Sequence, residues 1–527
     1  MTYLVVFVCG ILTSLPLIFD FLAFLPWFSL IPLFFIAEKK KSAYRHGLVF
    51  SLGYYGVLYY WFTYLYPLDF AGFSNSASVL LIIVAWLGLS LLQGIGTAFI
   101  PFIYRRLIIC DKPYFAPLAA ACLWCIGEWL QTKFWFGVPW GRLAVTQYKI
   151  LPVIQSASIL GSLFVGFLIV LVNGLLLIAI KKFRENKRVP LSAYIALALV
   201  FSNLAFGFVR LSFDGQKDSE KTITAASIQG NIASGDKWAD DSLSNSLKVY
   251  SELTETAVKE TGSTLIAWPE TVLTISISEN EGVRNKISEL SKKLSAYIAV
   301  GAFYSEKDSE NNEKTYNSIY LFHPDGTVNE SVYSKRRLVP FGEFLPMPNL
   351  IKVIFPFLAE MNMFDDNLSA GEGPSLFETE HGKIGGLVCF DSIYETLTLN
   401  SVREGAELFV LSTNDSWYLD SAAVYQHNGH AVLRAVESGR DIVRAANTGI
   451  SSIISKNGEI KAQLPPLVSG YVSEEVTLSS ERTLYSYVGN IIVFLSFAYI
   501  LVLSFFKVRA VLISKRHLNA IENEGPL

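Results

Sequence analysis

Charge is the first thing that this sequence has little of. Lys, Arg, Asp and Glu make up 17% of the 527 residues, whereas soluble globular proteins carry about 25%. The 43 basic residues are outnumbered by 46 acidic ones, so no basic surplus is present for binding a polyanion. We therefore expect no nucleic-acid partner. Hydrophobic residues make up 51% of the chain, which excludes a disordered protein and an ordinary water-soluble enzyme.

Cysteine and histidine are also scarce, at five and six residues. Four of the cysteines lie in or beside apolar segments and Cys389 stands alone in the polar part, so we expect no disulfide framework. Cys122 and Cys125 form a C-x-x-C with no second pair, a pattern that we interpret as helix packing. The histidines are scattered and no glycine-rich nucleotide loop occurs, so the sequence predicts no metal and no cofactor.

Long apolar runs are abundant instead. A helix needs about 20 apolar residues to cross the hydrocarbon core of a bilayer. Eight runs are candidates: 3–19, 21–37, 46–66, 77–104, 114–131, 156–180, 191–209 and 486–506. No Lys or Arg precedes Lys39, so the first run is predicted to be a retained span and not a cleaved signal. The sequence therefore predicts a polytopic α-helical membrane domain of about eight spans, with a large polar insert and the lipid bilayer as a partner.

The loops between these runs differ in basic charge. Basic residues follow the second, fourth, sixth and eighth runs, whereas the loop at 67–76 has none. Because cytoplasmic loops carry the excess of Lys and Arg, both termini are predicted to be cytoplasmic. The predicted organisation is a seven-span domain at 1–210, an extracytoplasmic domain at 211–484, a last span at 485–507 and a cytoplasmic tail at 508–527.

The polar insert has the pattern of an α/β domain. Short apolar runs have the length of buried strands, and amphipathic stretches between them have helical spacing. The predicted strands are Ser263–Trp268, Tyr297–Ala302, Ile384–Phe390 and Leu408–Ser412. The predicted helices are Ser242–Lys259, Gly282–Ser295 and His427–Arg444.

Cys389 is a candidate nucleophile because it ends one of these apolar runs. Reactive groups in α/β folds commonly lie at the carboxyl ends of strands, although a buried structural cysteine is the ordinary alternative. A catalytic thiol needs a base. His381 lies at the other end of the same run, and His427 and His430 lie on a predicted helix. None of the three has a setting typical of a cysteine hydrolase.

Two other strand ends carry charged residues. Glu270 follows Pro269 at the end of the run Ile266-Ala267-Trp268, and Lys335 opens a basic cluster that runs into Leu-Val-Pro-Phe-Gly. A surface glutamate and a solvated basic face are the ordinary interpretations of these residues. The apolar stretch after Lys335 nevertheless has the composition of a loop folded over a site.

In this order and context, Glu270, Lys335 and Cys389 resemble the Glu-Lys-Cys triad of the nitrilase (carbon–nitrogen hydrolase) superfamily. A nitrilase-like domain between seven spans and a final span resembles the apolipoprotein N-acyltransferase family. Leu338–Pro346, Gly137–Trp140 and Lys237-Trp238 are similar to motifs of that family. One departure is Phe390-Asp391, where well-known members have Tyr-Glu.

The resemblance implies a nitrilase-type αββα sandwich and an acyltransferase that works through a cysteine thioester. It implies that Cys389 is the nucleophile, Glu270 the general base and Lys335 the oxyanion stabiliser. Further implied site residues are Glu343, Phe390, Asp391, Trp238, Asn414, Trp417 and Trp140. The implied partners are a glycerophospholipid acyl donor and a diacylglyceryl-apolipoprotein acceptor. The implied location is the bacterial cytoplasmic (inner) membrane, with the catalytic domain on the periplasmic side.

Two alternatives to an acyltransferase remain at this level. A membrane-anchored amidase or hydrolase would use the same triad with water in place of the amine. A transporter or scaffold is disfavoured, since few charges lie within the predicted spans to mark an ion path. The sequence also leaves open whether Glu128, near the end of a span, reaches the interface or has a buried polar partner.

Overall fold

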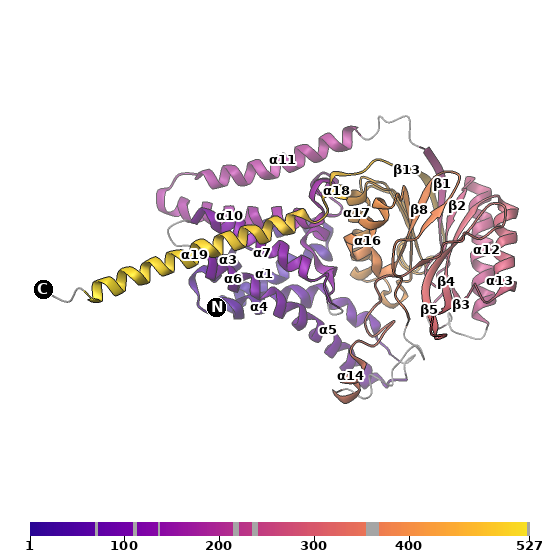
Figure 1. The fold of residues 1–527 in the computed structure, drawn as a ribbon, viewed down its shortest axis with the longest axis horizontal. Helices are drawn as coiled ribbons and strands as arrows, with labels where there is room; N and C mark the ends of the chain where they lie inside the picture. The colour runs from indigo at the N-terminus through magenta and orange to yellow at the C-terminus, as the bar shows by residue number, and fades with distance from the viewer. Residues whose placement is uncertain are drawn as a thin grey trace.

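The computed structural model of the chain describes residues 1–68, 72–108, 113–134, 137–213, 221–233, 235, 241–354 and 368–523. A helical half and an α/β half lie end to end along the long axis of the molecule (Figure 1). The last helix returns from the α/β half and runs along the helical half, so both chain ends lie on the helical side (Figure 1).

The helical half is built from the apolar runs. Its helices are α1 (Thr2–Ser14), α2 (Pro26–Ser29), α3 (Ile31–Lys39), α4 (Ala43–Leu58), α5 (Asn75–Thr97), α6 (Phe99–Leu107), α7 (Ala116–Leu130), α8 (Leu151–Ile154), α9 (Ala157–Leu160), α10 (Ser162–Asn186), α11 (Leu191–Phe213) and α19 (Ile491–Asn523). Within the described ranges, four helices are long and apolar enough to cross a membrane: 75–107, 162–186, 191–213 and 491–512.

The expected run 21–37 is not one helix. It is divided among the 3₁₀ turn Asp20–Leu22, α2 and α3. Pro26 and Pro32 each stand at the start of a helix, where the missing N–H of proline is tolerated, whereas a proline inside a helix would remove a hydrogen bond. Hydropathy alone does not indicate where a helix is interrupted. Within the described residues the structure has four long apolar helices, with shorter apolar helices beside them.

Helix α10 forms the centre of the helical half. In its most apolar window 72% of the residues are buried, compared with 22% in the corresponding windows of the other three long helices. Those three present apolar side chains outward, as a surface in contact with lipid tails would. The chain is therefore a membrane protein with several apolar helices around one buried helix.

The α/β half is a sandwich of two sheets. One sheet has the order β13-β1-β2-β4-β5-β6, with β3 also paired to β4, and the other has the order β12-β11-β10-β9-β8-β7. The first contains β1 (Lys221–Gln229), β2 (Leu265–Ala267), β3 (Leu273–Ser276), β4 (Tyr297–Lys307), β5 (Glu313–Phe322), β6 (Tyr333–Ser334) and β13 (Gly470–Leu478). The second contains β7 (Leu376–Glu378), β8 (Lys383–Val388), β9 (Leu408–Thr413), β10 (Ile442–Ala446), β11 (Ser452–Ile454) and β12 (Ile460–Gln463). The four predicted strands are confirmed as β2, β4, β8 and β9.

Helices cover both outer faces of the sandwich (Figure 1). Helices α12 (Ser242–Thr261) and α13 (Glu281–Leu294) lie on the first sheet, far from the helical half. Helices α16 (Glu395–Arg403) and α17 (Ala422–Ser438) lie on the second sheet and face the helical half. Two shorter helices are α14 (Pro348–Ile354) and α18 (Leu484–Val488). The layers are therefore those of an αββα sandwich.

The prediction of one helix over His427–Arg444 was wrong in its bounds. Helix α17 begins earlier, at Ala422, and ends at Ser438. Gly439 then takes the left-handed conformation that ends many helices, with φ at 66°. Arg444 consequently lies in strand β10 and not on the helix.

Candidate active site

Glu270 lies just beyond the end of β2, after Trp268 and Pro269, and is 6% exposed. Its Oε1 accepts hydrogen bonds from the Asn317 side-chain amide at 2.7 Å and from Lys335 Nζ at 2.9 Å. Its Oε2 accepts from the backbone N–H of Asn414 at 2.8 Å. Because Asn414 follows β9 of the second sheet, this carboxylate joins the ends of strands from both sheets.

Lys335 comes directly after β6 and is 1% exposed. Its Nζ lies 2.9 Å from Oε1 of Glu270 and 2.9 Å from Oε1 of Glu343. Burial alone would lower the pKa of this amine, but the two carboxylates outweigh burial and hold that pKa well above its usual range. The amine therefore remains a fixed cation near Cys389.

Glu343 is the second carboxylate in contact with the Lys335 amine. Its Oε2 accepts the backbone N–H of Val339 at 2.8 Å, and its Oε1 also accepts the Asn317 amide at 3.0 Å. Asn317 thus bridges the two carboxylates that contact Lys335. Asn317 lies in strand β5, and no role was predicted for it from the sequence, because the bridge depends on how the strands pair.

Cys389 directly follows the last residue of β8 and begins the 3₁₀ turn Cys389–Ile393. Its φ is +47°, a left-handed conformation that costs a residue other than glycine on the order of 1–3 kcal/mol. Burial, with Glu270 adding to it, raises the pKa of the thiol above its usual range even though Lys335 opposes them. The resting sulfur therefore carries its proton and needs a base before it can attack.

Asp391 ties the cysteine turn to the lysine loop. Its carboxylate is fully buried and accepts from the Tyr333 hydroxyl at 2.9 Å and the Arg337 backbone N–H at 2.8 Å. It also accepts from the backbone N–H of Val388 at 3.2 Å. Burial raises the pKa of Asp391 to about 6 despite these donors. These contacts indicate that Asp391 holds the two loops in register.

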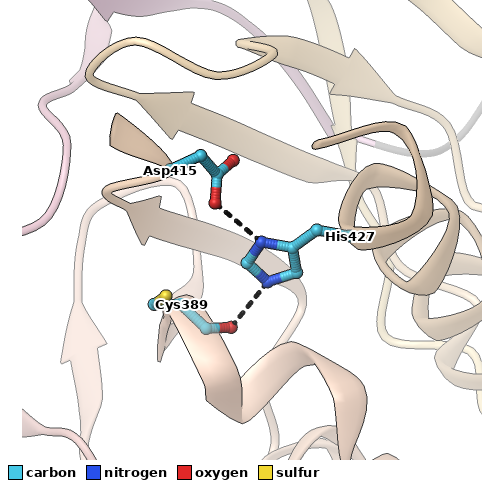
Figure 2. Close-up of side chains that lie close together, drawn as sticks. All are labelled: Cys389, Asp415 and His427. Carbon is cyan, nitrogen blue, oxygen red and sulfur yellow. Dashed lines mark hydrogen bonds and ion pairs between the residues drawn. The ribbon is translucent and has the colours of Figure 1, made fainter. Parts of the chain in front are cut away.

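His427 lies behind the cysteine, although its setting on a predicted helix did not indicate this contact. His427 Nδ1 lies 2.9 Å from Oδ1 of Asp415, and its Nε2 lies 3.1 Å from the carbonyl oxygen of Cys389. Figure 2 shows that this carbonyl, and not the sulfur, faces the ring. The pair is therefore not a thiol with its base. Long-range packing of α17 creates this contact, which sequence spacing does not reveal.

Cys389, Asp415 and His427 are of residue types that bind metals. One possible metal-ligating atom from each lies within 4.8 Å of the other two. Both ring nitrogens already have partners, however, and Arg444 contributes a guanidinium 2.8 Å from Oδ2 of Asp415. A cation in this cluster would meet that positive charge. The cluster therefore fits a hydrogen-bonded support better than a metal centre.

The other predicted site residues are distributed around this centre. The side chain of Phe390 packs on Trp140, with ring centroids 6.5 Å apart, and Trp140 donates to the Gln426 side chain at 2.7 Å. Asn414 contributes its backbone N–H to Glu270. Trp417 is half-buried in the turn Ser416–Tyr418 after β9. Trp238 lies outside the described residues.

Buried charges join the two halves beside the site. Glu128 accepts the Leu143 backbone N–H at 2.8 Å and the Trp124 indole at 2.9 Å, which identifies it as a buried polar partner. Arg142 pairs with Glu395 of α16 at 2.8 Å, both side chains being 1% exposed. This pairing lowers the pKa of Glu395 to about 2 against the opposing effect of burial. The site is thereby fixed against the helical half.

Comparisons with known proteins agree with this architecture. The family described as Carbon-nitrogen hydrolase matches residues 224–485. The sandwich, with a glutamate, a lysine and a cysteine meeting at its strand ends, is therefore a carbon–nitrogen hydrolase domain. The family described as Apolipoprotein N-acyltransferase N-terminal domain matches residues 9–175.

Two whole-length relatives resemble both halves. The chain is 32% identical over 495 residues to the apolipoprotein N-acyltransferase of Geobacter metallireducens, covering 93% of this chain and 92% of that protein. It is 26% identical over 466 residues to that of Haemophilus ducreyi, covering 86% of each. Nit3 of Saccharomyces cerevisiae, a nitrilase-superfamily member of solved structure, aligns at 20% identity with a TM-score of 0.38, over 51% of this chain and 93% of that one. The chain belongs to the apolipoprotein N-acyltransferase family, whose members are enzymes.

Proposed function

We propose that this enzyme moves an acyl chain from a glycerophospholipid to the α-amine of an N-terminal S-diacylglyceryl-cysteine. The observation that carries the proposal is the buried contact between Lys335 and Glu270, 2.9 Å apart, next to a cysteine held at a strained turn. The second support is the similarity to an apolipoprotein N-acyltransferase over 93% of this chain. The partners proposed are thus a phospholipid, a lipidated protein and the bilayer.

In the first half-reaction Glu270 takes the thiol proton and the sulfur of Cys389 attacks the ester carbonyl carbon. Lys335 Nζ and the backbone N–H of Phe390 stabilise the oxyanion that forms. The ester C–O bond breaks, and the leaving alkoxide takes the proton back from Glu270. The products are a Cys389 thioester and a lysophospholipid.

In the second half-reaction the acceptor amine attacks the thioester carbonyl. Glu270 takes the amine proton, the C–S bond breaks, and that proton returns to the sulfur of Cys389. The product is an amide and the free enzyme. Glu343 and Asn317 keep Lys335 and Glu270 in place through both steps, which explains why all four polar groups are buried together.

Phe390, Asp391, Asn414, Trp417 and Trp140 are proposed as the supporting set, with Trp238 of the family-like Lys237-Trp238 motif as a substrate contact. Asp391 and Asn414 act through backbone hydrogen bonds to the lysine loop and to Glu270. The centroid of the Trp140 ring lies 6.5 Å from that of Phe390 and 6.0 Å from that of Tyr418. This apolar wall suits an acyl chain, which costs about 0.8 kcal/mol per CH₂ to expose to water.

We also propose that all eight apolar runs span the membrane, including the short helices α1, α4 and α7. The organisation is then 1–210, 211–484, 485–507 and 508–527, with both termini in the cytoplasm and the sandwich on the periplasmic side. The Lys and Arg bias of the short loops supports this orientation.

Reporter fusions test the orientation. Fusions after Arg45, Arg106 or Arg188 are expected to be active as cytoplasmic reporters, because each follows a run with basic residues at its end. A fusion at Gly326, in a turn of the sandwich far from the helical half, is expected to be active only as an extracytoplasmic reporter. The reverse result at Gly326 would contradict the proposed substrate, since a lipidated acceptor is presented on the outer face.

Transfer and hydrolysis are separated by the fate of the thioester. A transferase excludes water from the thioester and admits a lipid-anchored amine, so the acyl-enzyme is expected to persist in buffer. It is expected to discharge when a diacylglyceryl-cysteine peptide with a free amine is added, as followed by the intact mass of the protein. The same peptide with an acetylated amine is the matched control and is expected to leave the adduct in place. Rapid loss in buffer, with free fatty acid released, would identify a hydrolase instead.

A further inference from the structure

The carbonyl group of Cys389 is held by two side chains. The Ser392 hydroxyl donates to this oxygen at 2.8 Å, and His427 Nε2 lies 3.1 Å from the same oxygen and 2.9 Å from Ser392 Oγ. Because the carbonyl oxygen of Cys389 and the carboxylate of Asp415 only accept, His427 donates to both when each ring nitrogen carries a proton. The carbonyl oxygen and the His427 ring lie on the side of Cys389 away from its sulfur (Figure 2).

The direction of this carbonyl fixes the direction of a second group. Residues 389 and 390 share one planar trans peptide unit, so the N–H of Phe390 points away from the C=O of Cys389. Two hydrogen bonds on the carbonyl therefore aim the N–H toward the sulfur side. That N–H is the second oxyanion donor of the proposed reaction.

The hydrogen bonds on the carbonyl oppose a rotation of the Cys389–Phe390 peptide plane. Cys389 itself has φ at +47°, a conformation that residues other than glycine seldom adopt. A rotation of the peptide plane, through ψ of Cys389 and φ of Phe390, would bring the carbonyl, an acceptor, to where the oxyanion forms. Such a flip would replace a stabilising donor by a repelling oxygen.

The imidazole itself is held rigidly. Its Nδ1 pairs with Asp415, whose other oxygen bonds to Arg444 at 2.8 Å. His427, Asp415 and Arg444 are each at most 1% exposed. The ring thus cannot turn away without breaking its buried hydrogen bond to Asp415.

We propose that His427 is a positioning residue for acyl transfer. Together with Ser392 it holds the Cys389–Phe390 peptide so that the Phe390 N–H forms the oxyanion hole. This inference rests on the proposed function, in which Cys389 attacks an ester carbonyl. It assigns no proton transfer to His427.

Two reactions of the same sulfur test the proposal in the full-length protein. Acylation by phospholipid passes through an oxyanion, whereas alkylation by iodoacetamide displaces iodide at a saturated carbon and forms none. In His427→Ala, acyl-enzyme formation is expected to fall by about 10²-fold, the usual effect of losing one oxyanion donor. The rate of Cys389 alkylation is expected to stay at the wild-type value at each pH measured.

Further variants control for folding. His427→Gln places an amide donor near the position of Nε2 and is expected to restore much of the acylation rate. Ser392→Ala removes the other donor and is expected to show the same selective loss, which keeps the test valid if His427→Ala does not fold. Asn428→Ala is the matched control: it lies on the same helix, is 2% exposed and bonds to Ser452 instead of the nucleophile turn. It is expected to acylate at the wild-type rate.

The outcomes are distinct. A selective loss of acylation in His427→Ala supports the proposal, and Ser392→Ala decides in its place if His427→Ala does not fold. Unchanged acylation in folded His427→Ala overturns it, and so does an equal fall of acylation and alkylation, which would indicate that His427 acts on the thiol. If wild-type protein forms no acyl adduct at Cys389, the proposed function itself fails, whatever the variants do.

Discussion

Replacing Cys389 by alanine is expected to abolish the acyl-enzyme and the transfer activity while leaving the protein folded. Loss of a nucleophile costs on the order of 10⁴–10⁶ in turnover in enzymes that use a comparable catalytic group. Cys389→Ser is expected to be nearly inactive as well. Burial already raises the pKa of the thiol, and a hydroxyl is a far weaker acid whose proton a carboxylate cannot remove effectively.

The measurement is the intact mass of purified protein after incubation with phospholipid. Cys122→Ala is the matched control, because Cys122 is a buried cysteine of α7 without a proposed role. It is expected to gain one acyl chain as the wild type does. An acyl adduct on Cys389→Ala would show that another residue is the nucleophile and would remove Cys389 from the mechanism.

Lys335→Met is expected to lower acyl-enzyme formation by about 10²-fold or more, because it removes the cation from the oxyanion site. It also leaves Glu270 and Glu343 facing each other, joined by the Asn317 amide but without their common counter-ion. Like charges this close favour protonation of one carboxyl, and a protonated Glu270 is no longer a base. The residual acylation rate in this variant is therefore expected to rise as the pH is raised.

Glu270→Gln is the companion variant. It keeps the size of the side chain and removes the base, so a loss of about 10²-fold or more is expected, with no recovery at high pH. Lys293→Met, which removes an exposed lysine paired with Glu255, is the control and is expected to acylate normally. Acylation at the wild-type rate in either active-site variant would exclude that residue from its assigned role.

The sequence predicted the strands that carry the site because each is a short apolar run bounded by polar residues. Leu265–Ala267 and Lys383–Val388 are strands as expected, and Glu270 and Cys389 follow them. The helix expected over His427–Arg444 shows the weakness of the same reasoning. Its apolar spacing continues past Gly439, but the backbone there turns left-handed and the chain enters β10.

In the membrane half, too, the sequence predicted some features and missed others. Hydropathy located the long helices α5, α10, α11 and α19, because about 20 apolar residues in a row leave few alternatives in a bilayer. It did not foresee that Pro26 and Pro32 divide the run at 21–37 into short helices. It also left Glu128 undecided, since burial depends on the neighbouring Leu143 and Trp124.

By itself, the sequence determined the class of protein, the family and the order of Glu270, Lys335 and Cys389, because residue types and local periodicity are written along the chain. The tertiary structure decided how those residues work together. The Asn317 bridge between two carboxylates, the His427 contact behind Cys389 and the Arg142–Glu395 pair each join segments dozens to hundreds of residues apart. Such contacts arise when strands pair and helices pack, so no local pattern encodes them.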